Sequence, residues 1–122
     1  MPDTQRSLIG NALRTVYVCH PFASDPQGHR ESIRGVCRIL VDGGVLPIAP
    51  QLLFRQFMDE RTERDLAMSF CLQLVALVDE LWVFGELSPG MRLEIAEAHR
   101  LGIPIVDGAT RDRRQSKGEP PR

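Results

Sequence analysis

The chain has 122 residues, of which 43% are hydrophobic and 25% are charged, and its formal net charge is −1 at pH 7. This size and composition are typical of one globular domain with its own core, and the near-neutral charge excludes the strongly basic proteins that bind nucleic acids or membrane surfaces. Residues 1–11 lack the apolar segment of a signal peptide, and no apolar run approaches the roughly 20 residues that span a bilayer, so we expect a cytoplasmic protein.

Strand and helix signals alternate along the chain. Residues 1–12 are polar, and we expect them to be flexible. The expected strands are residues 13–19, 45–49, 81–85 and 103–106. The expected helices run from Pro26 to Gly43-Gly44, from residue 64 to residue 78, and from Ser88 to about Gly102. Residues 51–63 are predicted to form a charged connection with a short helical piece near residues 52–58, and residues 109–122 a disordered basic tail.

This alternation predicts an α/β fold. We expect residues 13–108 to form a small, doubly wound, flavodoxin- or Rossmann-like parallel sheet of four to five strands with flanking helices. Tyr17 and Trp82 lie within strands and are expected in the core. Ligands of such sheets bind beyond the carboxyl ends of the strands. Residues 20–24 and 88–94 are therefore expected around one crevice.

The helix predicted over residues 64–78 is apolar almost all round. One side of it can pack on the sheet. The other side would meet either a second subunit, which would make the protein a homodimer or a higher homo-oligomer, or the segment 51–63 of the same chain.

Three cysteines, Cys19, Cys37 and Cys71, are widely spaced and form no CxxC pair. The three histidines do not complete a zinc-binding pattern with them. We therefore expect buried free thiols, and we predict neither a metal site nor a cofactor.

The segment from Ser88 to Glu94 has the pattern of a helix start that binds an anion. Ser88 suits the N-cap, Pro89 suits the first helical position, and Gly90 allows a ligand to approach the backbone. Glu94, one turn further, would face whatever the free N–H groups bind. The same pattern is common in helices without a catalytic role, because acidic residues near a helix N-terminus complement the helix dipole.

Several short motifs together resemble the nucleoside 2-deoxyribosyltransferase-like superfamily. They are Tyr17-Val18-Cys19-His20-Pro21-Phe22, Pro47-Ile48-Ala49-Pro50, the stretch from Asp79 to Gly85, Ser88-Pro89-Gly90-Met91 with Glu94, and Gly102-Ile103-Pro104-Ile105. The resemblance covers about residues 13–106, and its most specific element is the Gly-x-x-x-Glu helix start. Within the superfamily the chain is most similar to small bacterial proteins known as a domain of unknown function.

The resemblance implies a site and a chemistry. The superfamily's glutamate that matches Glu94 is a nucleophile that attacks the anomeric carbon of a sugar and expels the base. The position of Ser88 is a phosphate-binding serine in the branch that hydrolyses nucleoside 5′-monophosphates, and an aspartate in the nucleoside transferases. The loop after the first strand corresponds to the sugar-phosphate loop, and Phe22 is a candidate contact for the base. The substrate-binding residues expected on this basis are Ser88, Gly90, Met91, His20, Pro21, Phe22 and Ser24.

Two positions depart from the superfamily's pattern. Cys71 stands where an aspartate usually handles the proton on the leaving base, and Gln51 stands where close relatives tend to have histidine. A thiol is a poor substitute for a carboxyl group in that role. The chain could use His20, Asp79 or Asp65 instead.

Three functions remain open at this point. The leading hypothesis is an N-glycosidase that hydrolyses the base–sugar bond of a nucleoside 5′-monophosphate, and the expected partner is that nucleotide or a nucleoside. The second is a nucleotide-binding or sensing module with little turnover, which Cys71 and Gln51 favour. The third, a deoxyribosyltransferase, is disfavoured by Ser88.

Overall fold

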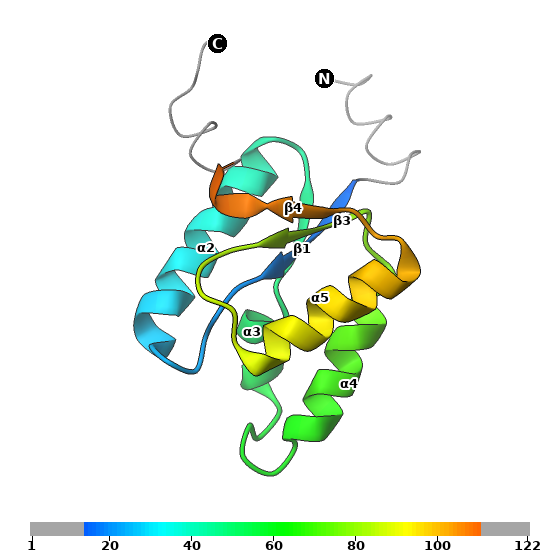
Figure 1. Cartoon of the computed structure of the whole chain (residues 1–122). Helices are drawn as coiled ribbons and strands as arrows, with labels where there is room; N and C mark the ends of the chain where they lie inside the picture. The colour runs from blue at the N-terminus through cyan, green and yellow to red at the C-terminus, as the bar shows by residue number, and fades with distance from the viewer. Residues whose placement is uncertain (1–13, 111–122) are drawn as a thin grey trace.

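The computed structural model describes residues 14–110, which form a four-stranded sheet with helices on both faces (Figure 1). All strand pairs are parallel, and the strand order is β2-β1-β3-β4. The strands are β1 (Thr15–Cys19), β2 (Leu46–Ile48), β3 (Glu80–Val83) and β4 (Ile105–Asp107). The predicted doubly wound α/β sheet is therefore confirmed, with four strands. The prediction for residues 1–12 lies outside the described residues, as does the prediction of a tail over residues 109–122 from residue 111 onward.

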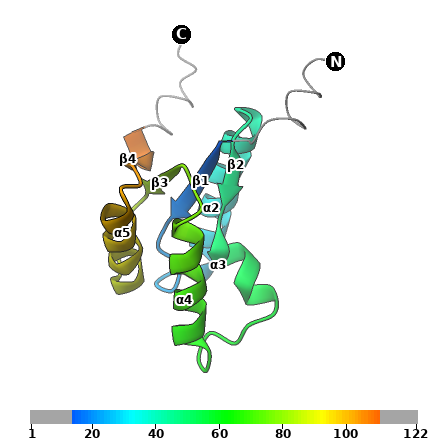
Figure 2. The ribbon, with the colours of Figure 1, turned by 90° about the vertical axis from the view of Figure 1, so that its right-hand side faces the viewer.

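The helices are divided between the two faces of the sheet. Helix α2 (Pro26–Asp42) covers one face, and α4 (Arg64–Val75) and α5 (Pro89–Leu101) cover the other (Figures 1 and 2). Right-handed crossovers require this division. The connection from β1 to β2 runs in one direction across the sheet, whereas the connections from β2 to β3 and from β3 to β4 run in the other. The direction reverses between β1 and β3, and ligands of such sheets bind near this point.

Alternation along β1 supplies both halves of the core. Val16 and Val18 pack with α2, whereas Tyr17 and Cys19 face α4 and α5. All four side chains are buried. Successive side chains of a strand point to opposite faces, so Tyr17 and Cys19 share the face that α5 covers. Their hydroxyl and thiol groups can therefore take part in a site on that face.

Several predicted boundaries were wrong by a few residues. Helix α4 ends at Val75 rather than residue 78, because the next two N–H groups bond three residues back and close the last turn. Strand β4 begins at residue 105 rather than 103, because the Ile103 N–H donates to the Ala98 carbonyl in the C-terminal cap around Gly102, whose φ is 73°. Strand β3 ends before Gly85, whose φ of 67° leaves the extended region.

The segment after β2 is partly helical, as expected. It contains α3 (Pro50–Leu53) and the 3₁₀ helix η1 (Phe54–Gln56). The ring centroids of Phe54 and Phe70 lie 5.9 Å apart, so this segment covers part of α4. Leu66 and Leu77 remain exposed. The homo-oligomer therefore stays a prediction.

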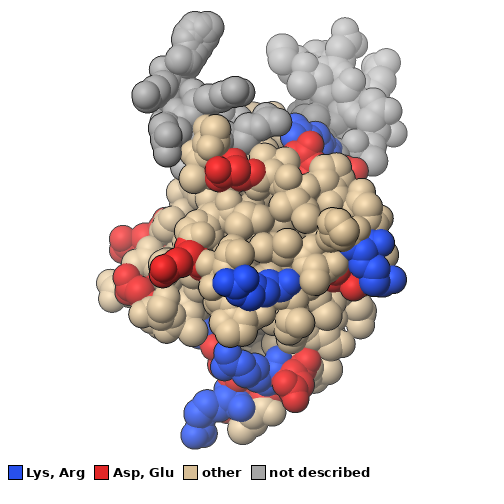
Figure 3. Space-filling view, in the orientation of Figure 1, with Lys and Arg blue, Asp and Glu red and all other residues tan. Residues whose placement is uncertain are grey.

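The surface shows no dominant charge on the face seen in Figure 3, where arginine and acidic side chains are interspersed. Among residues 14–110, no helix is both long and apolar enough to cross a membrane.

Candidate functional site

A pocket of about 250 Å³ lies beside the carboxyl ends of the central strands, on the side of α4 and α5. The loop after β1, the segment 50–60, α4 and the start of α5 form its wall. Nine of the residues predicted for the site line it: His20, Pro21, Phe22, Ser24, Cys71, Ser88, Gly90, Met91 and Glu94. The structure therefore brings together two segments that are about 65 residues apart in the sequence, as the fold prediction required.

Glu94 is the central polar group of this pocket. Its side chain is 6% exposed and belongs to the buried stripe of α5. The Tyr17 hydroxyl donates to Glu94 Oε2 over 2.6 Å, and the Cys19 thiol lies 3.3 Å from Glu94 Oε1. Both donors come from β1, so the strand and the helix together fix the orientation of the carboxylate.

The protonation states follow from burial. Burial raises the pKa of Glu94, while hydrogen bonds from Tyr17, Cys19 and Cys71 oppose this rise because they favour the charged form. Burial and the neighbouring Glu94 carboxylate raise the pKa of Tyr17 and of Cys19 far above neutrality. Burial also raises the pKa of Cys71, to about 11. At neutral pH the hydroxyl and both thiols therefore keep their protons, and all three can donate to one carboxylate.

The start of α5 has the expected capping geometry. Ser88 is the N-cap, with extended backbone, and its side-chain oxygen accepts from the Met91 N–H over 3.2 Å. That N–H is therefore not free for an anion, which corrects part of the expectation that the helix end offers unpaired donors. The Ser88 hydroxyl hydrogen remains able to donate into the pocket. At Gly90 a Cβ would lie 2.9 Å from Cε at the flexible end of the Met68 side chain, so α4 and α5 approach closely at this position.

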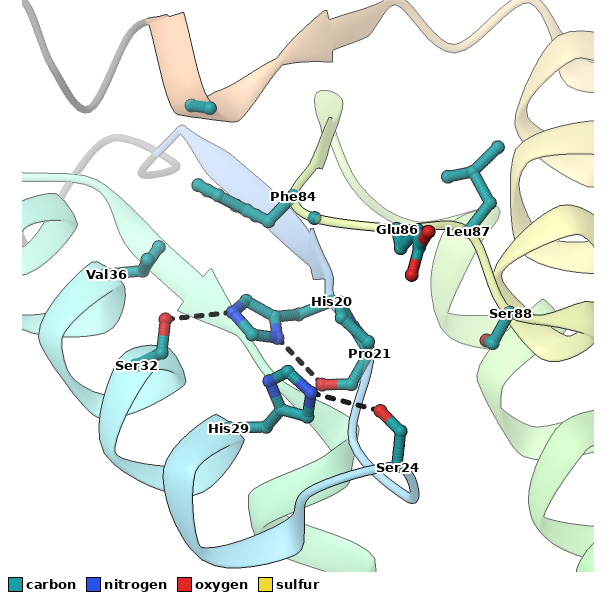
Figure 4. Close-up of a pocket in the computed structure, with 12 residues that line it drawn as sticks. His20, Pro21, Ser24, His29, Ser32, Val36, Phe84, Glu86, Leu87 and Ser88 are labelled. Carbon is teal, nitrogen blue, oxygen red and sulfur yellow. Dashed lines mark hydrogen bonds between the residues drawn. The ribbon is translucent and has the colours of Figure 1, made fainter.

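The loop after β1 is held by its own hydrogen bonds. His20 Nδ1 lies 2.7 Å from the Pro21 carbonyl oxygen, and His20 Nε2 lies 3.0 Å from the Ser32 hydroxyl (Figure 4). Because a carbonyl only accepts, Nδ1 carries the proton and Nε2 accepts from Ser32. Burial lowers the pKa of His20, which favours this neutral form. Ser24 Oγ lies 3.1 Å from His29 Nε2. These hydrogen bonds tie the loop to α2.

Phe22 has less freedom to contact a base than expected. Its ring is buried in the core next to α2, and the Arg55 guanidinium carbon lies 3.7 Å from its centroid. Arg55 also forms an ion pair with Glu60. Arg55, Asp59 and Glu60 all line the pocket, and none of them was predicted for the site. Their position in the sequence could have indicated a role in the site, because they belong to a charged segment that follows the carboxyl end of β2.

Two of the proposed proton-handling groups lie away from this pocket. Asp79 Oδ2 accepts from the Thr15 N–H over 2.7 Å, at the amino ends of β1 and β3. This is the edge of the sheet opposite to Glu94, because the strands are parallel. Asp65 is exposed on α4 and is not among the residues that line the pocket. Cys71 and His20 do line it.

Gln51 has a structural role beside the pocket. Its Nε2 donates to the carbonyls of Val18 and His20, over 3.1 Å each, and so ties α3 to the end of β1. Its Oε1 is buried and has no hydrogen-bond partner among residues 14–110. Within the same residues, no group of three or more His, Cys, Asp or Glu side chains could hold a metal ion.

Comparison with known proteins gives a family and a fold. Residues 14–107 match a family described as "Domain of unknown function (DUF7768)". Two solved structures share the fold: the 2-deoxyribosyltransferases of Bacillus psychrosaccharolyticus, with a TM-score of 0.59, and of Leishmania mexicana, with a TM-score of 0.57. Each enzyme is 17% identical to the chain in sequence, and each match covers 75% of the chain. The match covers 69% of the first enzyme and 61% of the second. No curated protein sequence matches the chain.

Proposed function

The chain belongs to this domain family of unknown function, and we propose that it is an N-glycosidase that hydrolyses the bond between base and sugar of a nucleoside 5′-monophosphate. Its fold is that of two 2-deoxyribosyltransferases, which supports a nucleoside-type substrate. Glu94 is the proposed nucleophile and Ser88 the proposed phosphate ligand.

The buried Glu94 carboxylate carries this proposal. A carboxylate that is 6% exposed and raised in pKa is costly in a core, so its presence on a pocket wall favours a chemical role. Tyr17 holds one oxygen at 2.6 Å and Cys19 approaches the other at 3.3 Å. This fixed orientation is what an attack on a sugar carbon requires.

The proposed reaction has two steps. First, one Glu94 oxygen forms a bond to the anomeric carbon while the bond from that carbon to the base nitrogen breaks. The base leaves with the electron pair and takes up a proton. Second, water attacks the anomeric carbon of the resulting ester, the carboxylate leaves, and the proton of the water passes to solvent. The products are the free base and the sugar phosphate.

The side chain at position 88 supports the phosphate in this proposal. Ser88 is neutral, caps α5 and lies on the pocket wall. A hydroxyl at a helix N-terminus suits an anion, whereas a carboxylate there would repel one. This is why the monophosphate hydrolase is preferred over the third candidate, a deoxyribosyltransferase.

Cys71 favours a second candidate function, a nucleotide-binding module with little turnover. A thiol with a pKa of about 11 is a weak acid for a leaving base. Loss of a general acid commonly costs about 100- to 10,000-fold in rate. His20 is not an obvious replacement, because the Pro21 carbonyl and the Ser32 hydroxyl engage its two nitrogens.

The test is an end-point assay of free base from a panel of ribo- and deoxyribonucleoside 5′-monophosphates and nucleosides, at high enzyme concentration. The control is Glu94→Gln, which keeps the shape of the side chain. Base release that disappears in Glu94→Gln would support the N-glycosidase. Nucleotide binding without base release would support the binding module. Base exchange that needs an added acceptor base would support the transferase.

A further inference from the structure

A second and larger cavity adjoins the Glu94 pocket. Its volume is about 710 Å³, and it lies between α2, the loop after β1 and the loop after β3 (Figure 4). The mononucleotide chemistry proposed above does not use this cavity. Its size is within the roughly 300–1,000 Å³ range of small-molecule sites.

The two cavities meet at the proposed phosphate position. His20, Pro21, Ser24 and Ser88 line both of them. A phosphate held by Ser88 would therefore lie at the junction, with the sugar toward Glu94. Any group joined to that phosphate would continue into the second cavity.

The second cavity has the lining of a site for a neutral, hydroxylated ring. Val36, Phe84 and Leu87 provide apolar surface, and the rings of Phe84 and His20 contact one another at a tilt of 33°, with centroids 5.7 Å apart. Ser32 and Glu86 add a hydroxyl and a carboxylate. Carboxylates and hydroxyls are the usual partners of sugar hydroxyl groups, as in the acidic residue that binds a ribose in dinucleotide sites.

The same lining is unsuited to a terminal phosphate. None of the described residues that line the second cavity is Lys or Arg, and Glu86 is acidic. His20 is held in its neutral form by Pro21 and Ser32. The other histidine of the lining, His29, has its Nε2 3.1 Å from Ser24 Oγ, so a chain of phosphates that ended here would meet neither lysine nor arginine.

We propose that the second cavity holds the distal sugar of a nucleoside 5′-diphosphate ester whose base and first sugar occupy the Glu94 pocket. The ester, rather than the monophosphate, is then the preferred substrate. This inference rests on the proposed position of the nucleotide in the Glu94 pocket. The distal sugar adds contacts in the cavity without taking part in bond cleavage.

The test measures binding separately from turnover. Calorimetric titrations of Glu94→Gln would compare UMP, UDP and UDP-glucose, and likewise AMP, ADP and ADP-ribose. We expect the ester of at least one series to bind about 10- to 100-fold more tightly than its monophosphate, as a few hydrogen bonds and a buried ring would give. The diphosphate without a distal sugar should show no such gain.

Two variants locate the gain. Ala109 lines the second cavity and is exposed, so Ala109→Trp in the Glu94→Gln background should block the distal sugar and reduce the affinity for the ester to that for the monophosphate. Ala96→Trp places the same side chain on the exposed side of α5, where it lines neither cavity, and should change neither affinity. Glu86→Ala should lower the affinity for the ester several-fold.

Three results would overturn the inference: equal affinity for ester and monophosphate, equal affinity for ester and diphosphate, or equal losses for ester and monophosphate in Ala109→Trp. Its failure is distinguishable from that of the proposed function. Tighter binding of the ester with no base release by the wild-type protein would leave the cavity assignment standing and refute the N-glycosidase. Base release from monophosphates, with no gain from the ester, would do the reverse.

Discussion

Tyr17→Phe tests whether Glu94 is a nucleophile that its neighbours hold in place. The Tyr17 ring is fully buried, and its hydroxyl donates to Glu94 Oε2 over 2.6 Å. The substitution removes one oxygen atom and leaves the apolar packing of the ring in place. Cys19 and Cys71 would remain as donors to the carboxylate, and both are weaker donors than a phenol.

The size of the effect follows from the type of hydrogen bond. A hydrogen bond to a charged group contributes about 1.5–3 kcal/mol, and each 1.4 kcal/mol corresponds to a factor of ten. We therefore expect kcat/KM for base release to fall about 10- to 100-fold at pH 7. The loss should depend on pH. The Tyr17 hydrogen bond lowers the pKa of Glu94, so its removal raises that pKa, and the nucleophile loses its charge at a higher pH than before.

The assay is a pH profile of kcat/KM for base release by the wild-type protein and by Tyr17→Phe. The acidic limb should move to higher pH, and part of the lost rate should return in alkaline buffer. Thr15→Val is the matched control, because it removes a hydroxyl at the other end of the same strand, where Thr15 bonds to Asp79. An unmoved acidic limb in Tyr17→Phe, or an equal shift in Thr15→Val, would refute the assignment of Glu94 as the titrating nucleophile.

Three further substitutions separate the roles of the site residues. Because burial raises the folded-state pKa of Glu94, its charge opposes folding fully above the folded pKa, and this cost shrinks as the pH falls below that value and is gone below the unfolded pKa. Glu94→Gln should therefore raise Tm at pH 7–8, by about 4–8 °C per kcal/mol relieved, and the gain should shrink toward pH 4.5; a constant or negative difference in thermal melts would contradict this. Cys71→Asp should speed base release at least about tenfold in the end-point assay, and an unchanged or lower rate would refute the role given to position 71. Ser88→Asp keeps an N-cap oxygen for the Met91 N–H, so Tm should hold while the preference for monophosphate over nucleoside falls about tenfold or more; an unchanged preference would show that the phosphate binds elsewhere.

The fold was predictable because its signals are local. The β-formers within residues 13–19 indicate a strand. Helix boundaries are marked by the proline after Asp25 and by the glycines at the ends of helices. The errors occurred where a boundary depends on hydrogen bonds between residues that local pattern does not pair. Ile103 has the composition of a strand residue, but its N–H completes the cap of α5 by bonding to Ala98. Caps of this kind override β-propensity at the first residue after a helix.

The site was only partly predictable, because its geometry depends on contacts between distant residues. The sequence placed Tyr17 in the core, and it is fully buried, but nothing local showed that its hydroxyl reaches Glu94, which is 77 residues away. Asp79 could have been set aside from the sequence alone. It precedes a strand, and the amino ends of parallel strands lie at the edge opposite to the ligand site.

An enzyme and a binding module would require different properties of the Glu94 carboxylate on α5. Met91, Glu94 and Ala98 form the buried stripe of the helix, and an apolar residue in the middle of this stripe would stabilise the domain more than a carboxylate does. Both functions could explain why the charge is retained there, but they require different properties of it. A binding module needs only an acceptor for a sugar hydroxyl, which the amide oxygen of Gln supplies, so Glu94→Gln would bind nucleotide as well as the wild-type protein does. A glycosidase also needs the negative charge at the moment the base leaves, and Gln cannot supply it. The comparison of binding with base release in Glu94→Gln is therefore decisive: retained binding with lost release identifies the enzyme, and retained binding with no release from the wild-type protein identifies the module.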